Sequence, residues 1–256
     1  MPVTYVSTAE AIARDGLRMV VVPGVPSPWG EAAKGILHVK GIDWTAVRLA
    51  YDDPALKDWA GSRSGPVAIF GQEPPRAGWA EILLLAERLA PDPALLPADP
   101  AERALAFGLA HEICGEQGLG WSRRLQLIHL GQQGAGGFHP KAAAYLGRKY
   151  GYTPAAGEAA AARTAALLAM LAARLRAQAA DGSGYYLGDG LTAVDIYSAA
   201  FMALFRPLPE ALCAMDPGTR AAFESRDPVT DAALDPILLR HRDRIYRDHL
   251  ELPLSL

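Results

Sequence analysis

Residues 188–196, GDGLTAVDI, decide the fold, because this stretch combines a turn, a helix start and an acid that faces a core. Thr192 is placed to cap the helix that follows, and Asp195 can accept a bond from the backbone amide of Thr192. Residues 196–205 are so apolar that this helix must lie in a core. The stretch therefore predicts a capped, buried helix late in the chain, and Asp195 is assigned to folding rather than to catalysis.

Composition indicates a globular protein of ordinary charge. The chain has 256 residues, 50% of them hydrophobic, and a formal net charge of -3 at pH 7. It lacks the basic excess that binding to nucleic acid requires, so no nucleic-acid partner is expected, nor a membrane-surface partner. Cys114 and Cys213 are the only cysteines and lie far apart in sequence. They suggest neither a disulfide framework nor a metal site, which fits a reducing cytoplasm.

No targeting or membrane-spanning segment is expected from the sequence. Glu10, Arg14 and Asp15 fall where a signal peptide would need an unbroken apolar run. The most hydrophobic long segment, residues 155–180, is interrupted by charged side chains and has leucines at helical spacing. It therefore predicts an amphipathic core helix, and a cytoplasmic location is expected.

The first part of the chain alternates between strands and helices. Its predicted elements are strands at residues 17–22, 45–49 and 67–70 and helices at residues 29–39 and 79–89. Ser7 can cap a further short helix through Ala13, whose purpose the sequence does not show. Four prolines between residues 91 and 100 then mark a linker. We place one domain at residues 1–90, the linker at residues 91–100 and a second, all-helical domain at residues 101–256.

Every long segment after the linker has helical periodicity. A helix beginning near residue 101 is predicted to extend to about His111 or beyond, with a glycine-rich break before Trp121. The loop at residues 131–137 has four glycines, but no strong strand precedes it and the dinucleotide pattern is not met. It is interpreted as a flexible connector rather than a phosphate cradle. A last helix at residues 236–250 is expected to be partly exposed.

An alternating α/β module, a proline linker and a helical domain with a Thr-x-x-Asp cap resemble the cytosolic glutathione transferase family. Residues 19–29, running into residues 39–42, are similar to the family's first strand, active-site loop and first helix. Residues 65–67 lie where thioredoxin-like proteins place a cis-proline, and residues 191–196 match the helix-capping motif. The resemblance implies an α/β plus all-α fold, with an N-terminal thioredoxin-like domain and a C-terminal all-helical domain of the transferase type.

The resemblance assigns the catalytic role to Ser27, which occupies the position of the hydroxyl in serine-type members. A free thiol titrates near pH 8.5 and is mostly protonated at neutral pH. A hydroxyl that donates to the thiolate, at the amino end of a helix, lowers the thiol pKa. Ser27 is alternatively a turn residue that only shapes the loop between Pro26 and Pro28.

The resemblance also implies glutathione-binding positions at Gly65, Pro66 and Val67 and at the start of the next helix, Gly78 and Trp79. A cis bond before Pro66 would offer backbone hydrogen bonds to the cysteinyl part of glutathione, and a trans proline at a strand start is the alternative. Family members usually carry a Glu or Gln and a Ser at the helix start. Here free backbone amides are left to bind the γ-glutamyl carboxylate, helped by Arg76, unless Trp79 fills the site.

A pocket for the second substrate is expected from Trp29, His111 and Trp121. Trp29 either walls that pocket or is an apolar plug at the helix start, and His111 is alternatively a structural or surface histidine. The implied function is that of a glutathione transferase, with glutathione as co-substrate attacking a small hydrophobic electrophile in detoxification. A homodimer and no metal are expected. The alternative is a binding protein of the same fold that has lost glutathione catalysis.

Overall fold

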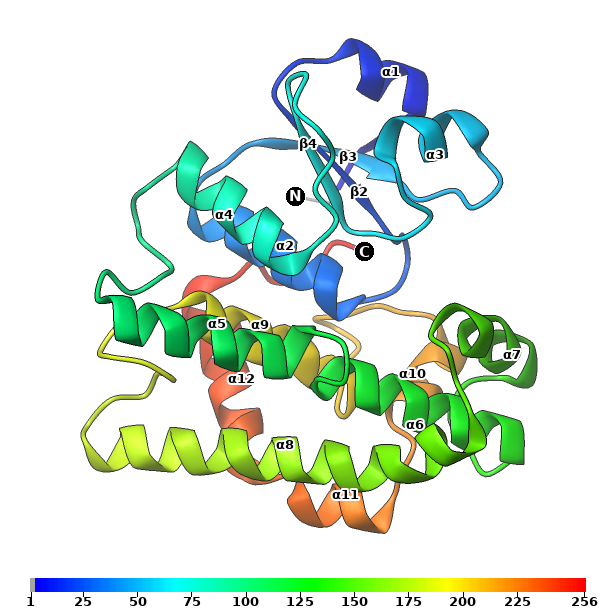
Figure 1. Cartoon of the computed structure of the whole chain (residues 1–256), viewed down its shortest axis with the longest axis vertical. Coiled ribbons are helices and arrows are strands. Elements are labelled where there is room, and N and C mark those ends of the chain that lie inside the picture. Colours follow the sequence, from blue (N-terminus) through cyan, green and yellow to red (C-terminus); the bar gives the residue numbers. More distant parts are fainter. Residues whose placement is uncertain (1–2) are drawn as a thin grey trace.

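The structure, a computed structural model, describes residues 3–256. An α/β domain at the amino end lies above a larger helical domain (Figure 1). The first domain contains β1 (Tyr5–Val6), α1 (Thr8–Ala13), β2 (Leu17–Val21), α2 (Pro28–Val39), β3 (Trp44–Arg48), α3 (Pro54–Ala60), β4 (Val67–Phe70) and α4 (Trp79–Leu89). This confirms the expected thioredoxin-like domain followed by a helical domain.

The sheet of the first domain has the strand order β1-β3-β2-β4. β2 pairs in parallel with β3 and antiparallel with β4. Because successive side chains of a strand point to opposite faces of the sheet, β2 contributes side chains to two hydrophobic cores. Met19 and Val21 face α2 and the helical domain, whereas Val20 packs with residues of α1 and α3. The sheet is therefore covered on both faces, and α2 and α4 lie between it and the helical domain (Figure 1).

The segment before β2 extends the sheet by one strand. Tyr5 and Val6 pair in parallel with Ala46 and Val47 of β3. Ser7 then caps α1 by accepting from the backbone N–H of Glu10, as the sequence predicts. The short helix whose purpose the sequence does not show thus follows a strand that covers the edge of β3.

The second domain is entirely helical. It contains α5 (Pro100–Cys114), α6 (Leu119–Gln133), α7 (Pro140–Lys149), α8 (Pro154–Ala180), α9 (Ala193–Phe201), the 3-10 turn η1 (Met202–Leu204), α10 (Pro217–Phe223), α11 (Pro228–Ala233) and α12 (Pro236–His249). α8 has the length and apolar composition of a membrane-crossing helix. Its leucines are nevertheless buried and it packs against α6 and α11, which agrees with the predicted core helix.

The segment at residues 131–137 differs from the expected connector, because α6 continues to Gln133. Gly134, with φ +69°, ends the helix in the left-handed region. A Cβ at Gly131 would lie 2.0 Å from the carbonyl oxygen of Phe138. These glycines therefore let the chain fold back closely against α6.

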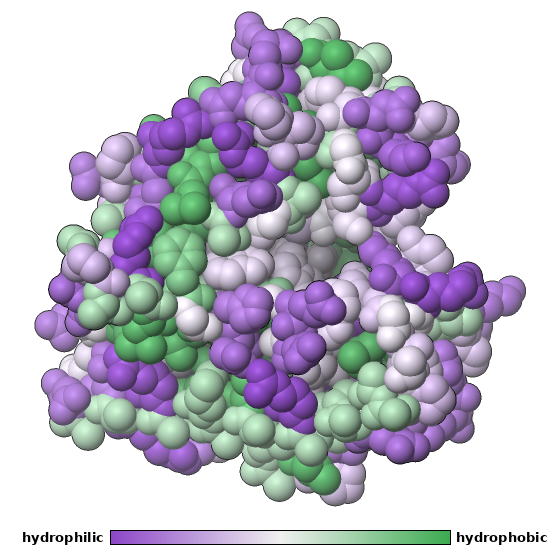
Figure 2. Space-filling model, viewed as in Figure 1, coloured by the Kyte–Doolittle hydropathy of each residue, from purple (hydrophilic) through white to green (hydrophobic). Residues whose placement is uncertain are grey.

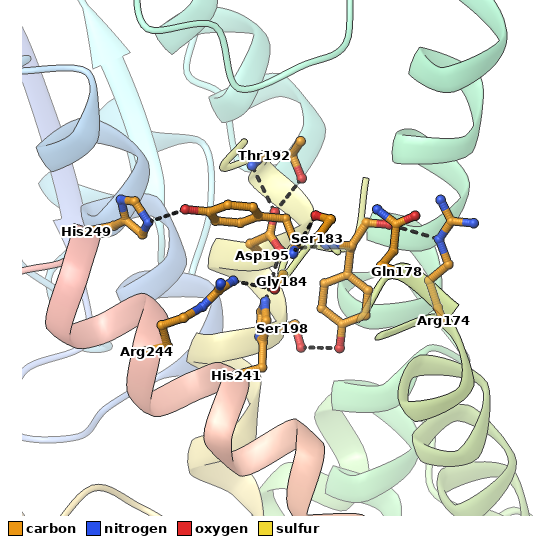
Figure 3. Close-up of polar contacts among 12 residues, drawn as sticks. Arg174, Gln178, Ser183, Gly184, Thr192, Asp195, Ser198, His241, Arg244 and His249 are labelled. Carbon is orange, nitrogen blue, oxygen red and sulfur yellow. Dashed lines mark hydrogen bonds and ion pairs between the residues drawn. The ribbon is translucent and has the colours of Figure 1, made fainter. Parts of the chain in front are cut away.

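The motif at residues 188–196 lies at the centre of the helical domain, where Asp195 is fully buried. Its Oδ2 accepts from the backbone N–H of Thr192 at 2.9 Å, as predicted. The Thr192 hydroxyl also donates to this oxygen, at 2.8 Å, and the two residues form a capping box. Oδ1 accepts from the backbone N–H of Tyr186 at 2.9 Å and lies 2.9 Å from His241 Nε2 (Figure 3). Asp195 therefore joins the start of α9 to a loop and to α12.

Candidate functional site

Ser27 lies between β2 and the first turn of α2, where the two domains meet. Its backbone N–H donates to Val25 O at 2.7 Å, and its carbonyl accepts from Glu31 N at 2.8 Å. The side chain is partly exposed and makes no capping hydrogen bond, while Pro28 occupies the first helical position. A free hydroxyl is therefore presented at the amino end of a 12-residue helix, where the helix dipole favours negative charge.

Gly65 lies beside β2, and the Gly65–Pro66 peptide bond is cis. A Cβ at Gly65 would lie 3.2 Å from Val20 O and 3.4 Å from Val21 Cα, which leaves little room for a side chain. Within residues 3–256, the backbone N–H and C=O of Gly65 make no hydrogen bond. Val67 is different, since it is fully buried and pairs with Val20 in the sheet. Gly65 therefore offers a free backbone edge, while the Val67 side chain belongs to the core.

The start of α4 is partly occupied by the protein itself, because two of the groups expected to bind a carboxylate already have partners. Gly78 has no side chain for capping, and its N–H donates to Glu81 Oε2 at 2.9 Å. Arg76 Nη2 donates to Glu73 Oε2 at 2.6 Å. Gly followed by Glu three residues later is half of a capping box, so this pairing was readable from sequence. One amide and one cation are thereby withdrawn from binding a carboxylate.

Trp79 turns its ring toward the helical domain. The ring lies 5.6 Å from that of Tyr197, 6.2 Å from Phe107 and 6.5 Å from His111, measured between centroids. With Trp29, Pro66 and others it lines a cavity of only about 10 Å³, which is at most the space of one water molecule. Trp79 thus closes the crevice between Pro66 and the helical domain.

Trp29 is fixed between the two domains. Its Nε1 donates to Cys114 O at 2.8 Å, and its ring meets that of Phe201 edge-on at 4.8 Å. A Cβ at Gly120 would lie 2.3 Å from Phe201 Cε1 and 3.0 Å from Trp29 Cη2, so glycine is required there. These contacts agree with Trp29 as a plug at the helix start, although one face of its ring lies under the guanidinium of Arg124.

The other two residues expected at the second-substrate pocket belong to different aromatic groups. His111 is exposed on α5 and lies beside Trp79. Trp121 on α6 packs edge-on against Tyr150 at 5.0 Å. Arg124, which sequence reasoning missed, also contacts Tyr150. The sequence indicated Arg124 only through the adjacent pair Arg123 and Arg124, which lies in a helix with one buried face.

The surface is hollowed between the two domains on the face seen in Figure 2, where Figure 1 shows the start of α2 above α6. A separate cavity of about 560 Å³ lies beside the middle and end of α2 and is lined by Glu31, Lys34 and Tyr246, among others. Burial raises the pKa of the Glu31 carboxyl, although Lys34 Nζ lies 2.7 Å from Glu31 Oε1 and opposes this. None of the predicted site residues lines this larger cavity.

Solved structures of glutathione S-transferases share this architecture. The enzyme from Methylobacterium radiotolerans, in complex with glutathione sulfonate, is 20% identical, with a TM-score of 0.60 and 91% of each chain covered. A glutathione S-transferase domain-containing protein from Marinobacter aquaeolei is 18% identical, with a TM-score of 0.63 over 90% of this chain and 98% of that one. The enzyme from Methylobacillus flagellatus with GSH bound is 13% identical, with a TM-score of 0.60, covering 91% and 95%.

Neither the protein-family models nor the curated proteins include a match to this chain. At identities of 13–20% the structural likeness defines the fold. The chain therefore has the glutathione transferase fold, in agreement with the resemblance seen in its sequence.

Proposed function

We propose that this protein binds glutathione between its domains and that Ser27 activates the thiol for attack on a hydrophobic electrophile. The observation that carries this proposal is the hydroxyl of Ser27, which lies at the first turn of α2 and makes no capping hydrogen bond. The unpaired backbone groups of Gly65 support it, since they can hydrogen-bond an extended peptide. Two structures of the same fold contain GSH or glutathione sulfonate, which suggests the ligand.

The chemistry requires stabilisation of a sulfur anion. A donated hydrogen bond from Ser27 and the positive end of the α2 dipole both favour thiolate over thiol. The thiol proton passes to solvent, and the sulfur lone pair forms a bond to the electrophilic carbon while the leaving group departs with its electron pair. The helix start supplies a fixed electrostatic environment for the charged form.

Replacing Ser27 by alanine should lower kcat/KM for glutathione conjugation by about a hundredfold, because one anion-stabilising donor is lost. Ser27→Thr keeps a hydroxyl donor and should therefore retain most of the activity. Steady-state conjugation of an activated aryl chloride measures both, with thermal unfolding as the check on folding. Equal activity of the alanine variant and the unchanged protein would remove Ser27 from the mechanism.

A second candidate is a binding protein of this fold without glutathione turnover. It is favoured by the start of α4, where Glu81 takes the Gly78 amide and Glu73 takes Arg76. If the γ-glutamyl carboxylate approached this helix start, the Glu81 carboxylate would repel it. Calorimetric titration with millimolar glutathione decides between the candidates, since absence of heat favours the second.

Glu81→Ala provides a further test of how the α4 start affects glutathione. The substitution frees the Gly78 amide and removes a carboxylate from a helix terminus that attracts anions. Glutathione affinity should therefore rise by about threefold to tenfold, in line with the energy of one helix-terminal charge. The exposed Glu102→Ala in the first turn of α5 is the matched control. Unchanged affinity in Glu81→Ala would show that glutathione does not reach α4.

A further inference from the structure

The guanidinium of Arg124 lies between two aromatic rings beside the turn that carries Ser27. Its Cζ is 4.7 Å from the centroid of the Trp29 ring and 4.8 Å from that of Tyr150. Nη1 also donates to the Tyr150 hydroxyl. Trp29 follows Ser27 by two residues, in the first turn of α2. The arginine is thus held in a fixed plane at the junction of the two domains.

Arg124 is charged but has no acidic partner among residues 3–256. Arg206, which is also half-buried, pairs with Asp231 at 3.0 Å. The Nε of Arg124 is buried without a hydrogen bond, and only Nη1 has an acceptor. A guanidinium has five N–H donors in a flat fork that matches a carboxylate. The structure therefore presents a pre-oriented cation with most of its donors unused.

Two further aromatic side chains, one from each domain, contact each other. Tyr51 follows β3 and Tyr145 lies on α7, and their rings meet edge-on at 6.0 Å. Both are large exposed side chains, at 51% and 42%. Burial of its hydroxyl raises the pKa of Tyr51; Tyr145 and Tyr150 add to this, and Arg124 opposes it. Tyr51 and Tyr145 thus form an exposed aromatic pair with one ring from each domain.

We propose that Arg124 binds a carboxylate of the acceptor substrate, so that the acceptor is a planar aromatic acid. Its ring would pack on the tyrosines while the two oxygens accept from Arg124, and the electrophilic carbon would face the sulfur held by Ser27. This inference rests on the proposed function. For an aryl chloride, sulfur forms the C–S bond, the C–Cl bond breaks, chloride leaves with the bonding pair, and the thiol proton goes to solvent.

The first test measures binding without any thiol. Calorimetry compares 3,5-dinitrobenzoate with its neutral methyl ester on the unchanged protein, Arg124→Gln and Arg124→Lys. The unchanged protein should bind the acid at least about tenfold more tightly than the ester, as expected for a charge-assisted pair. Arg124→Gln should abolish that preference and Arg124→Lys should keep part of it. An equal preference in Arg124→Gln and the unchanged protein overturns the proposal.

The control variant is Arg240→Gln, which removes an exposed positive charge from α12 and should leave the preference unchanged. A lost preference in Arg240→Gln would assign the effect to overall charge and overturn the proposal. Thermal unfolding of each variant reports its folding. If Arg124→Gln does not fold, Arg124→Lys decides, because loss of the flat fork alone should weaken acid binding and leave ester binding intact.

The second test uses turnover of 4-chloro-3,5-dinitrobenzoate and its methyl ester with glutathione. Arg124→Gln should raise KM for the acid by about tenfold and leave KM for the ester and for glutathione unchanged. A raised KM for glutathione with an intact acid preference would mean that Arg124 binds a glutathione carboxylate, which overturns the proposal. If neither compound turns over, the proposed function fails, and the thiol-free titration still decides the role of Arg124.

Discussion

Asp195→Asn should lower the free energy of unfolding by about 2–4 kcal/mol, although the two side chains have the same shape. Each carboxylate oxygen of Asp195 accepts from one backbone N–H, that of Tyr186 at Oδ1 and that of Thr192 at Oδ2, both at 2.9 Å. An amide has only one oxygen, so either orientation of asparagine points an NH2 group at a backbone N–H. His241 and the Thr192 hydroxyl can reorient, but the two amides cannot. One buried donor is therefore left without an acceptor.

The measurement is urea unfolding followed by circular dichroism. Asp189→Asn is the matched control, because Asp189 is exposed in the same motif and its loss should change the free energy by less than about 0.5 kcal/mol. Asp195→Ala should cost about 3–5 kcal/mol, since it leaves both amides and His241 without the carboxylate. A loss below about 1 kcal/mol in Asp195→Asn would mean that water reaches this site.

The elements with strong local signals were predictable from the sequence. The bounds of β4 and α4 agree with those predicted, because Pro66 and Gly78 mark their starts. By contrast, β1 has only two residues and exists because it pairs with β3, about forty positions later. α3 was also missed, since it is a short helix whose start depends on capping by Asp53. Elements that owe their stability to distant partners leave little trace in a local pattern.

The candidate site was predictable where the fold alone fixes the backbone. Ser27 lies at a helix start and Gly65 lies beside a strand, as the order of elements in the sequence predicts. Whether the backbone groups of Gly78 are free, and which way the Trp79 ring points, depends on side-chain conformations that the sequence spacing does not reveal. Gly78 is occupied because Glu81 folds back on it, and Trp79 turns toward Tyr197 rather than into solvent.

Arg123 and Arg124 are adjacent residues of the same type, and the sequence alone does not predict that their surroundings differ. Successive residues of a helix point about 100° apart, so the two side chains enter different surroundings. Arg124 faces the junction of the domains and stacks on Trp29. Arg123 is 1% exposed and lies inside the helical domain. Its acceptors are mostly about 80 to 100 positions away, in segments that no local pattern connects to α6.

Arg123→Met should lower the free energy of unfolding by about 3–5 kcal/mol, because it removes the charge but leaves its acceptors buried. The guanidinium donates to the carbonyl oxygens of Leu204, Phe223 and Ser225 at 3.1, 3.2 and 2.7 Å. Nη1 donates to Gln126 Oε1 at 2.8 Å. Burial lowers the pKa of Arg123 to about 10, which still leaves it charged at pH 7. Methionine fills similar space with no donor.

Urea unfolding measures this loss, with Arg163→Met as the matched control. Arg163 pairs with Glu112 on the surface, and its removal should change the free energy of unfolding by less than about 1 kcal/mol. Hydrogen exchange should also quicken at the end of α10, because the carbonyls of Phe223 and Ser225 lose the cation that joins them to α6. Equal costs for the two variants would contradict a joining role for Arg123, since Arg123 binds buried groups from distant segments whereas Arg163 forms a surface ion pair.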